Sequence, residues 1–297
     1  MKITRGIHLV DASQWMNYEI DIPIHVYLLL TKEGVVLIDS GTAASPQSSI
    51  YPYLKKLGMS PKDVFLLINT HGHLDHIGGN FEIKDKSRAK IAAHKLDVPW
   101  IINHDLQFKE AQSRPEIMPP PKEDRDFFYK IVGKETVVDI ALQDGHTWDF
   151  EPDFKLRLIH TPGHSKGSIS IYEEERKILF TGDSVQHKGS QVTITPCYID
   201  VNAYLASLER LRSLEIDYLL PSHFSILKGS DTQKFILESI EYVTIMEKKV
   251  KNAILAPNTV RSVTESVCRM LGSTKITPQA IFTVEAHLRK LAKTLDI

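Results

Sequence analysis

The 297-residue chain lacks the features that would assign it to several special classes of protein. Its two cysteines, Cys197 and Cys268, have no paired spacing, which argues against a disulfide scaffold and favours a reducing compartment. No apolar run reaches the roughly 18 to 20 residues that span a bilayer, and the N-terminus has no long apolar segment typical of a signal peptide. Opposite charges nearly cancel, to a formal net charge of −1, so charge indicates neither a nucleic-acid nor a membrane partner. These absences predict a cytoplasmic protein.

The composition and the apolar pattern indicate an α/β protein with a large core. Hydrophobic residues make up 42% of the chain and charged residues 25%, as in ordinary globular proteins, and the length allows one large domain or two. Short apolar runs predict strands over residues 7–10, 25–30 and 35–39, with Gly34 in a hairpin turn. Ser45 and Pro46 predict the N-cap and first position of a helix over residues 45–57. Strands and helices then alternate as far as residue 223.

A dense group of ligand-type side chains follows the apolar run at residues 64–68. Residues 70–79 read T-H-G-H-L-D-H-I-G-G, which places His71, His73, Asp75 and His76 within six positions. Imidazole and carboxylate groups are the ligands that suit zinc and neighbouring transition metals. A strand end is rigid enough to hold ligands within the distances that a metal requires. The sequence therefore predicts a metal site where this strand ends.

Three later segments repeat one form, in which an apolar run meets a Gly or Pro and then presents one ligand-type residue. The segments are L-R-L-I-H-T-P-G-H ending at His164, K-I-L-F-T-G-D ending at Asp183, and I-D-Y-L-L-P-S-H ending at His223. We expect these three residues at the same sheet edge as the first group. Five histidines and two aspartates are too many ligands for one tetrahedral ion and suit two ions that share a bridge.

The order H-x-H-x-D-H, then H, D and H, resembles the metallo-β-lactamase superfamily over about residues 1–228. The resemblance implies a four-layer αββα sandwich of two mixed sheets. It also implies that Asp39, in I-D-S-G at residues 38–41, orients a ligand from behind. It assigns the metal ligands as follows: His71, His73 and His164 to the first ion, Asp75, His76 and His223 to the second, and Asp183 to both.

Such a centre would be a metal-dependent hydrolase in which two divalent ions create a bridging hydroxide at neutral pH. Zinc is the first expectation, and manganese or iron(II) would accept the same ligands. Asp75 would also orient the hydroxide, which makes it the catalytic carboxylate, and no serine or cysteine nucleophile is needed. The acid that protonates the leaving group stays open among His187, Tyr198 and a metal-bound water.

Asp183 narrows the substrate, because true β-lactamases of the superfamily have Cys or Ser in place of a bridging Asp. The resemblance then implies a small ester, lactone or thioester as substrate, in the glyoxalase II or lactonase-like branch. The glutathione-contacting pattern that glyoxalase II enzymes carry after their last histidine is missing after His223. The substrate-binding residues stay unassigned, and a homo-oligomer is left open.

From residue 229 the chain reads as helix, which predicts a C-terminal helical domain over residues 229–297 behind a hydrolase domain over residues 1–228. Ser230 and Gln233 have the form of a capping box that opens a long amphipathic helix. This layout loosely resembles the superfamily's short endoribonucleases, so the alternative function is an endoribonuclease or phosphodiesterase with the C-terminal helices assisting RNA binding. Ten Lys and Arg against seven Asp and Glu in this part are a weak basic bias, and nucleic acid is not favoured.

The segment between the first ligand group and His164 carries an insertion over about residues 99–132 with no clean period and several aromatic residues. A long structureless stretch in a compact domain is usually functional or mobile, which suggests a lid over the metal edge. A helical insertion packed on its own domain is the equal alternative.

Overall fold

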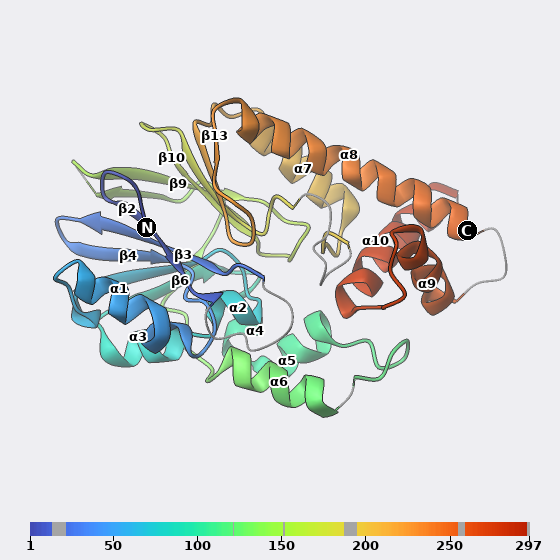
Figure 1. The fold of residues 1–297 in the computed structure, drawn as a ribbon, viewed down its shortest axis with the longest axis horizontal. Helices are drawn as coiled ribbons and strands as arrows, with labels where there is room; N and C mark the ends of the chain where they lie inside the picture. Colours follow the sequence, from blue (N-terminus) through green and yellow to red (C-terminus); the bar gives the residue numbers. More distant parts are fainter. Residues whose placement is uncertain (14–21, 121, 151, 187–194, 255–258, 296–297) are drawn as a thin grey trace.

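Two β-sheets form the centre of the molecule (Figure 1). The computed structural model describes residues 1–13, 22–120, 122–150, 152–186, 195–254 and 259–295. The first sheet has seven strands in chain order: β1 (Lys2–Thr4), β2 (Ile7–Asp11), β3 (His25–Thr31), β4 (Gly34–Ile38), β5 (Val64–Asn69), β6 (Lys90–His94) and β7 (Ile140–Leu142). The second has six strands in the order β13 (Leu227–Lys228), β12 (Tyr218–Pro221), β11 (Ile178–Gly182), β10 (Ile169–Glu173), β9 (Phe154–His160) and β8 (Thr147–Phe150).

Both sheets mix parallel and antiparallel pairs, because hairpins join some strands and helical crossovers join others. In the first sheet β1 to β4 are antiparallel and β4 to β7 are parallel. In the second sheet only β11 and β12 run parallel, joined by helix α7 (Val201–Arg212). Loops that carry candidate functional side chains follow directly after β5, β11 and β12.

Apolar side chains form three layers of core that make the fold a four-layer αββα sandwich, as predicted. Residues of both sheets, such as Ile38 and Phe180, pack face to face in the middle. Leu54 of α1 (Tyr51–Lys56) and Ile83 of α3 (Asn80–Lys86) cover the outer face of the first sheet. Leu208 of α7 covers the outer face of the second sheet, and α8 (Ser230–Ala253) lies beside α7 (Figure 1).

The N-terminal elements agree with the predictions, although one N-cap side chain bonds outside its helix. Gly34 follows the hairpin turn with φ +135°, and a Cβ there would lie 2.3 Å from the Asp63 carbonyl oxygen, so the position requires glycine. The predicted helix forms as a turn at Pro46–Ile50 followed by α1, with Pro46 at its first position. Ser45 is the N-cap residue, as predicted, but its hydroxyl accepts a hydrogen bond from the Thr42 amide and caps no amide of the helix.

Three C-terminal helices follow the second sheet: α8, α9 (Val260–Met270) and α10 (Pro278–Leu295). The predicted capping box at Ser230 is wrong, because Gly229 is the N-cap of α8 and Gln233 donates its side chain to the Leu214 carbonyl. Ile236 and Val243 of α8 join the core that α7 forms on the second sheet. Farther along α8, Val250 packs with residues of α9 and α10 in a separate cluster.

The insertion is largely helical and packs on its own domain, as the alternative expected, so the expectation of a structureless stretch is wrong, whereas its role as a lid stays a prediction. It contains α4 (Val98–Ile102), α5 (His104–Gln107), a turn at Phe108–Gln112 and α6 (Lys122–Val132). Phe108 and Phe128 pack against Ile77 of the loop that carries His71 and against Ala93 of β6, on the side of the molecule that holds the first sheet. Apolar side chains spaced along these short helices therefore anchor the insertion to its own domain.

Within the part of the chain that the structure describes, no helix combines the length and the apolar character needed to cross a bilayer. Cys197 and Cys268 are both buried as free thiols.

Candidate metal centre

The first ligand group lies in the loop between β5 and α3, which includes the short helix α2 (Leu74–Ile77). The backbone of the neighbouring loop holds it closely, since the Ser40 amide donates to the His76 carbonyl oxygen at 2.8 Å. Gly78 and Gly79 make this approach feasible. A Cβ on Gly78 would lie 2.5 Å from the Ile131 carbonyl oxygen, and one on Gly79 would lie 2.5 Å from the Ser40 carbonyl oxygen. The two glycines after the histidines therefore serve close backbone packing.

The other three ligand-type residues come from loops of the second sheet. His164 lies between β9 and β10, Asp183 follows β11, and His223 follows β12. The expectation of a single sheet edge is therefore wrong: the site spans the ends of both sheets. The face-to-face packing of the sheets brings these ends together, and a Cβ on Gly182 would lie 2.5 Å from the Thr70 hydroxyl oxygen.

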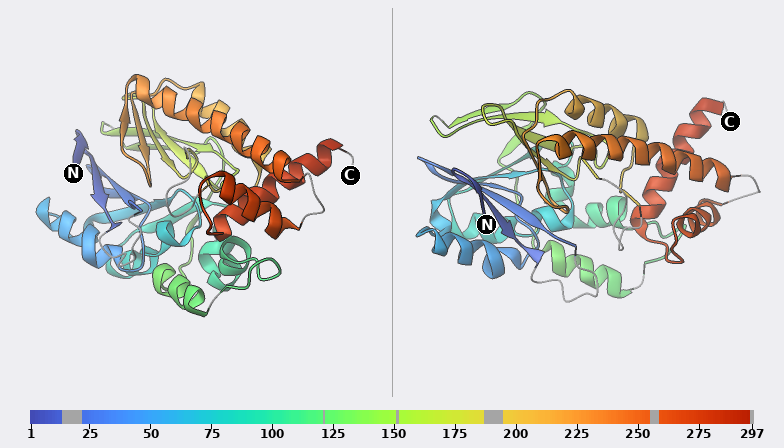
Figure 2. Two further views of the ribbon diagram at one scale, coloured as in Figure 1. Left: turned by 45° about the vertical axis from the view of Figure 1, so that its right-hand side comes forward. Right: turned by 45° about the horizontal axis from the view of Figure 1, so that its top comes forward.

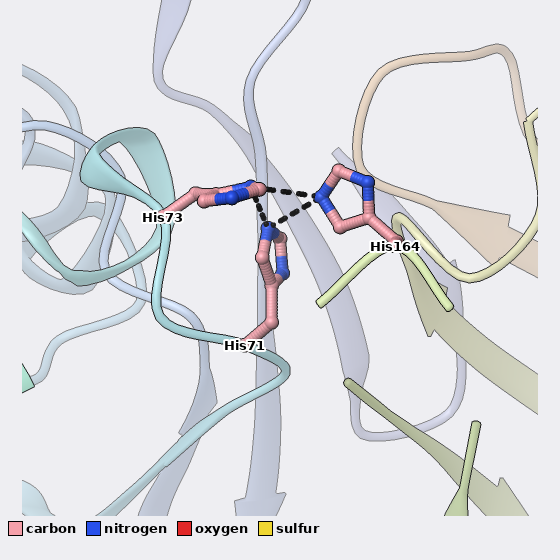
Figure 3. Close-up of side chains that lie close together, drawn as sticks. All are labelled: His71, His73 and His164. Atoms are coloured by element: carbon pink, nitrogen blue, oxygen red, sulfur yellow. Dashed lines mark hydrogen bonds between the residues drawn. The ribbon is translucent and has the colours of Figure 1, made fainter. Parts of the chain in front are cut away.

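Three histidines form a compact group of ring nitrogens (Figure 3). His71 Nε2 lies 3.0 Å from His73 Nδ1 and 3.1 Å from His164 Nε2, and the last two nitrogens are 2.8 Å apart. Nitrogens bound to one tetrahedral zinc at about 2.0–2.1 Å would lie about 3.3 Å apart. The three side chains point toward one another with nearly this spacing, so they could hold one ion.

A second group adjoins the first and contains two carboxylates. His76 Nε2 and His223 Nε2 are 3.2 Å apart, and Asp75 Oδ2 lies 3.3 Å from His223 Nε2. Asp183 faces both groups: its Oδ1 is 3.3 Å from His223 Nε2, and its Oδ2 is 3.5 Å from His164 Nε2. The structure thus brings together all seven residues singled out in the sequence, with Asp183 between the two groups.

Acceptors behind the histidines set the direction of three rings. His76 Nδ1 lies 2.8 Å from Asp39 Oδ2, which places Asp39 where the resemblance predicted it. His164 Nδ1 lies 2.6 Å from the Cys197 carbonyl oxygen, and His223 Nδ1 lies 2.5 Å from that of Pro23. With a hydrogen on each Nδ1, the Nε2 atom is the one directed into the site, which is the arrangement common behind metal-ligating histidines.

The two groups differ in their protonation. Burial lowers the pKa of His71 and His73 well below the ordinary value, and the neighbouring imidazoles add to this effect. Burial also lowers the pKa of His76 and His223, but the carboxylates around them outweigh it. Asp75, Asp39 and Asp183 raise the pKa of His76, and Asp183 with Asp75 raises that of His223 to about 10. The first group is therefore neutral at pH 7, whereas His223 in the second carries positive charge opposite the carboxylates.

Asp97 is a functional residue that the sequence reasoning missed. Its Oδ2 accepts hydrogen bonds from the Gly72 amide at 2.9 Å and the Ser165 hydroxyl at 2.6 Å, and its Oδ1 accepts one from the Gly167 amide at 2.7 Å. Gly72 lies between His71 and His73, and Ser165 follows His164. One buried carboxylate therefore ties together the two loops that carry the three-histidine group.

The insertion also contacts the site. The Trp100 ring of α4 stacks on His73 with ring centroids 5.5 Å apart and an angle of 14° between the planes. The Gln107 side chain of α5 donates a hydrogen bond to the Gly72 carbonyl oxygen. Helices α4 and α5 thus cover one side of the histidine loop.

Two residues considered as leaving-group acids have different outcomes. Tyr198 is fully buried and its hydroxyl lies 2.8 Å from His287 Nε2, so it belongs to the contact between its loop and α10. His187 lies outside the described residues.

Comparison with known proteins agrees with this geometry. Residues 20–223 match the family described as the metallo-beta-lactamase superfamily. The chain is 29% identical over 237 residues to the acyl-coenzyme A thioesterase MBLAC2 of Homo sapiens. The aligned region covers 73% of this chain and 80% of that protein. It is 26% identical over 226 residues to an N-acyl homoserine lactonase of a Bacillus species, covering 66% of this chain and 77% of that one.

Among solved structures, the metallo-beta-lactamase family protein TTHA1429 from Thermus thermophilus superposes with a TM-score of 0.81 at 20% identity. The match covers 99% of this chain and 95% of that one, so the overall fold is shared along nearly the whole length. The family match spans more than half of the chain and ends at the last predicted ligand. The chain therefore belongs to the metallo-beta-lactamase superfamily, and the prediction of a hydrolase of that superfamily is confirmed.

Proposed function

We propose that the chain holds two divalent metal ions and hydrolyses a small ester, lactone or thioester, with acyl thioesters as the first candidates. The position of Asp183 carries this proposal. Its Oδ2 faces His164 at 3.5 Å, and its Oδ1 faces His76 at 3.7 Å and His223 at 3.3 Å. A carboxylate with each oxygen directed at a different group of donors suits a bridge between two cations.

The donor set fits such ions in its chemistry. We assign the ligands as follows: His71, His73 and His164 to the first ion, Asp75, His76 and His223 to the second, and Asp183 to both. Zinc is the first candidate, because neutral imidazole and carboxylate ligands at near-tetrahedral spacing suit it. Manganese and iron accept the same ligands.

Ions bound there would supply an activated water at neutral pH and positive charge near the oxyanion of the transition state. The protein contributes orientation. The Asp75 side chain is 26% exposed, against 10% for Asp183, so Asp75 is the carboxylate that can meet substrate and water. We assign it the role of accepting a hydrogen bond from the attacking water and holding that water toward the carbonyl carbon.

The serines next to the ligands have other partners, which supports a mechanism without a side-chain nucleophile. The buried Ser165 hydroxyl donates to Asp97 at 2.6 Å, and the buried Ser184 hydroxyl lies 2.6 Å from that of Thr161. Neither hydroxyl has a histidine placed as its base among the contacts that the structure describes. These serines act as parts of the loops.

The relatives favour acyl transfer to water over phosphodiester cleavage. The matched curated proteins include acyl-coenzyme A thioesterases, a lactonase and a hydroxyacylglutathione hydrolase, all of which cleave an acyl group from oxygen or sulfur. The bridging position of Asp183 also disfavours β-lactam hydrolysis. A thioester carbonyl is the more reactive acyl centre, and the thioesterases are the relatives at 29–30% identity.

The test is a panel of lactones, thioesters, phosphodiesters and short RNA, run on protein with quantified metal. We expect about two ions per chain and turnover of the acyl substrates. Asp75→Ala should reduce kcat by at least about a thousandfold with unchanged circular dichroism, since it removes both a ligand and the orienting carboxylate. Asp85→Ala, at an exposed aspartate on α3, is the matched control. Turnover of RNA alone would favour the endoribonuclease alternative, and an active Asp75→Ala protein would refute the site assignment.

A further inference from the structure

A cavity of about 550 Å³ lies next to the candidate metal centre, between the insertion and the last helix. Trp100, Lys109 and Arg114 of the insertion form one wall, and Arg289 of α10 lies on another, with Lys166 and Ile199 between them. The insertion and the C-terminal helices lie side by side at this end of the molecule (Figures 1 and 2). The volume is within the range of small-molecule sites, about 300–1,000 Å³.

The cavity adjoins the metal centre, because three of its lining residues contact a ligand or lie in or against the loop that carries one. Trp100 stacks on His73, and Lys166 is two residues from His164. Ile199 donates its amide to the Gly163 carbonyl oxygen at 2.7 Å, in the loop that presents His164. A substrate whose acyl carbon is at the metals can therefore extend its other end into this cavity.

Four cationic side chains from separate segments line the cavity, and two of them are held in place. Arg114 Nε donates to Glu285 at 3.0 Å, and its guanidinium lies 4.0 Å above the Phe282 ring. Arg289 Nη2 donates to the Ile199 carbonyl oxygen at 3.0 Å, which anchors α10 to the loop below. Arginines fixed in this manner present preformed donors to an anion.

The other two cations, Lys109 and Lys166, are exposed, and no described residue forms an ion pair with either ammonium group. Two of the acidic lining residues have structural roles: Glu110 accepts from Trp100 Nε1 at 2.9 Å, and Asp200 caps α7 through the Ala203 amide. The third acidic lining residue, Glu116, is exposed and forms no ion pair with either lysine among the described residues, so the lysines provide positive charge that is not used in ion pairs within the cavity. Such charge is suited to a ligand with several negative charges.

We propose that the substrate is a thioester whose leaving thiol carries phosphate groups, and that this cavity binds those phosphates. The insertion and α10 would then select the substrate. The proposal rests on the proposed function, since the acyl end of the same substrate is hydrolysed at the metals. It gives the two accessory parts of the chain one shared role, because Lys109 and Arg114 of the insertion and Arg289 of α10 add cations to Lys166 of the sandwich. The arginines set the position of the phosphates, and the lysines add attraction.

Binding can be measured without turnover, using coenzyme A as the probe and titration calorimetry as the readout. In the double variant Lys109→Glu/Lys166→Glu we expect affinity about tenfold weaker than in the unmodified protein, the loss expected for one or two charge-assisted contacts at an exposed site. Lys62→Glu, an exposed lysine before β5, makes the same kind of charge change away from the cavity and should leave affinity unchanged. Affinity should also fall with added salt. Absent binding, or binding equal in the double variant, would overturn the proposal.

Activity gives a second readout through a ratio. Two thioesters with the same acyl group are compared, one on coenzyme A and one on pantetheine, which has no phosphate at its end. The ratio of their kcat/KM values should fall about tenfold in the double variant and stay constant in Lys62→Glu. A metal-loaded protein that binds coenzyme A through the lysines yet cleaves no thioester, lactone or ester would refute the proposed function and leave the binding site standing. Binding of a short RNA with the same dependence on Lys109 and Lys166, in preference to coenzyme A, would overturn the assignment to a thioester.

Discussion

The two halves of the candidate metal centre are built from similar ligands but differ in charge. The three-histidine group of His71, His73 and His164 is buried and has neutral rings, because desolvation lowers the pKa of each. In the group of Asp75, His76 and His223, nearby carboxylates raise the pKa of both imidazoles, to about 10 for His223, which therefore keeps a positive charge. The first half is therefore already in the protonation state that binds a metal, whereas in the second a cation must replace a proton. The difference arises mainly from Asp39 and Asp75, which lie beside the second half, whereas Asp183 lies between the two.

We expect the largest effect when one ligand is removed from either half, which tests whether the two halves each hold an ion. His73→Ala should remove the first ion and His223→Ala the second, and each should reduce kcat/KM by at least about a thousandfold, because the proposed mechanism uses both ions. Metal content after dialysis should fall from about two ions to about one in each variant. His146→Ala, at an exposed histidine outside the site, is the control. Full turnover in a protein with one ion would show that the halves do not act together.

Asp97→Ala should affect the first half alone. It removes the acceptor for three hydrogen bonds that join the loops of His73 and His164, and we expect a loss of about 3 kcal/mol in the free energy of unfolding. Chemical denaturation of the metal-free protein measures this loss. Competition with a chelator should show weaker binding of the first ion and unchanged binding of the second. Equal weakening of both would mean that Asp97 supports the whole site.

Proton release should sharpen the comparison. At pH 8, above the lowered pKa of His71 and His73, the first ion should displace no proton from its ligands. The second should displace about one, because the pKa of His223, raised to about 10, keeps that ring protonated. Affinity in the second half should thus weaken as pH falls, while the proton competes with the metal. Calorimetry in buffers of different ionisation enthalpy gives the proton count. The same count in His223→Ala as in the unmodified protein would contradict the assignment.

We expect the smallest effect from a substitution outside both halves of the metal centre, which serves as a reference for the variants above. Glu247 of α8 lies next to Lys290 of α10 and 2.7 Å from Lys251, and these lysines outweigh the burial that would raise its pKa and lower it to about 2. A lowered pKa stabilises the fold above about pH 4.5, and this contribution is lost as pH falls toward 2. Glu247→Gln should cost less than about 1 kcal/mol at pH 7, because the pair is partly exposed, and nothing near pH 2. Thermal unfolding at both pH values checks this, and metal content should not change.

The sequence carried enough information to find the ligands, because each is marked locally. His71, His73, Asp75 and His76 are close in the chain, and His164, Asp183 and His223 each follow an apolar run broken by Gly or Pro. The same local signals predicted β2 to β5 and the helix that begins at Pro46. Periodicity and breakers determine the ends of strands, so residues at those ends can be inferred without knowing how the sheets pack.

Features that depend on packing could not be inferred in this way. Asp97 is a single aspartate after β6, and its partners Ser165 and Gly167 are 68 and 70 residues away in the chain. The division of the ligands between two sheets depends on their face-to-face contact, which strand patterns do not encode. The insertion was equally ambiguous, because α4 and α5 are each too short to show a helical period, and tertiary contacts such as those of Ile101 and Phe108 with Ile77 and Ala93 support them.

The position of the ligands on the ends of two different sheets has a mechanical consequence. His76 and His223 are 147 residues apart in the chain, yet their Nε2 atoms lie 3.2 Å apart. An ion held by both would act as a cross-link that closes a very long loop, much as a disulfide does, and would restrict the unfolded chain accordingly. Both cysteines of the chain are free thiols, so no disulfide joins the two sheets. Metal ions bound at this site would then cross-link the two sheets in addition to taking part in catalysis. Removing the metal ions should weaken the packing between the two sheets before either sheet unfolds.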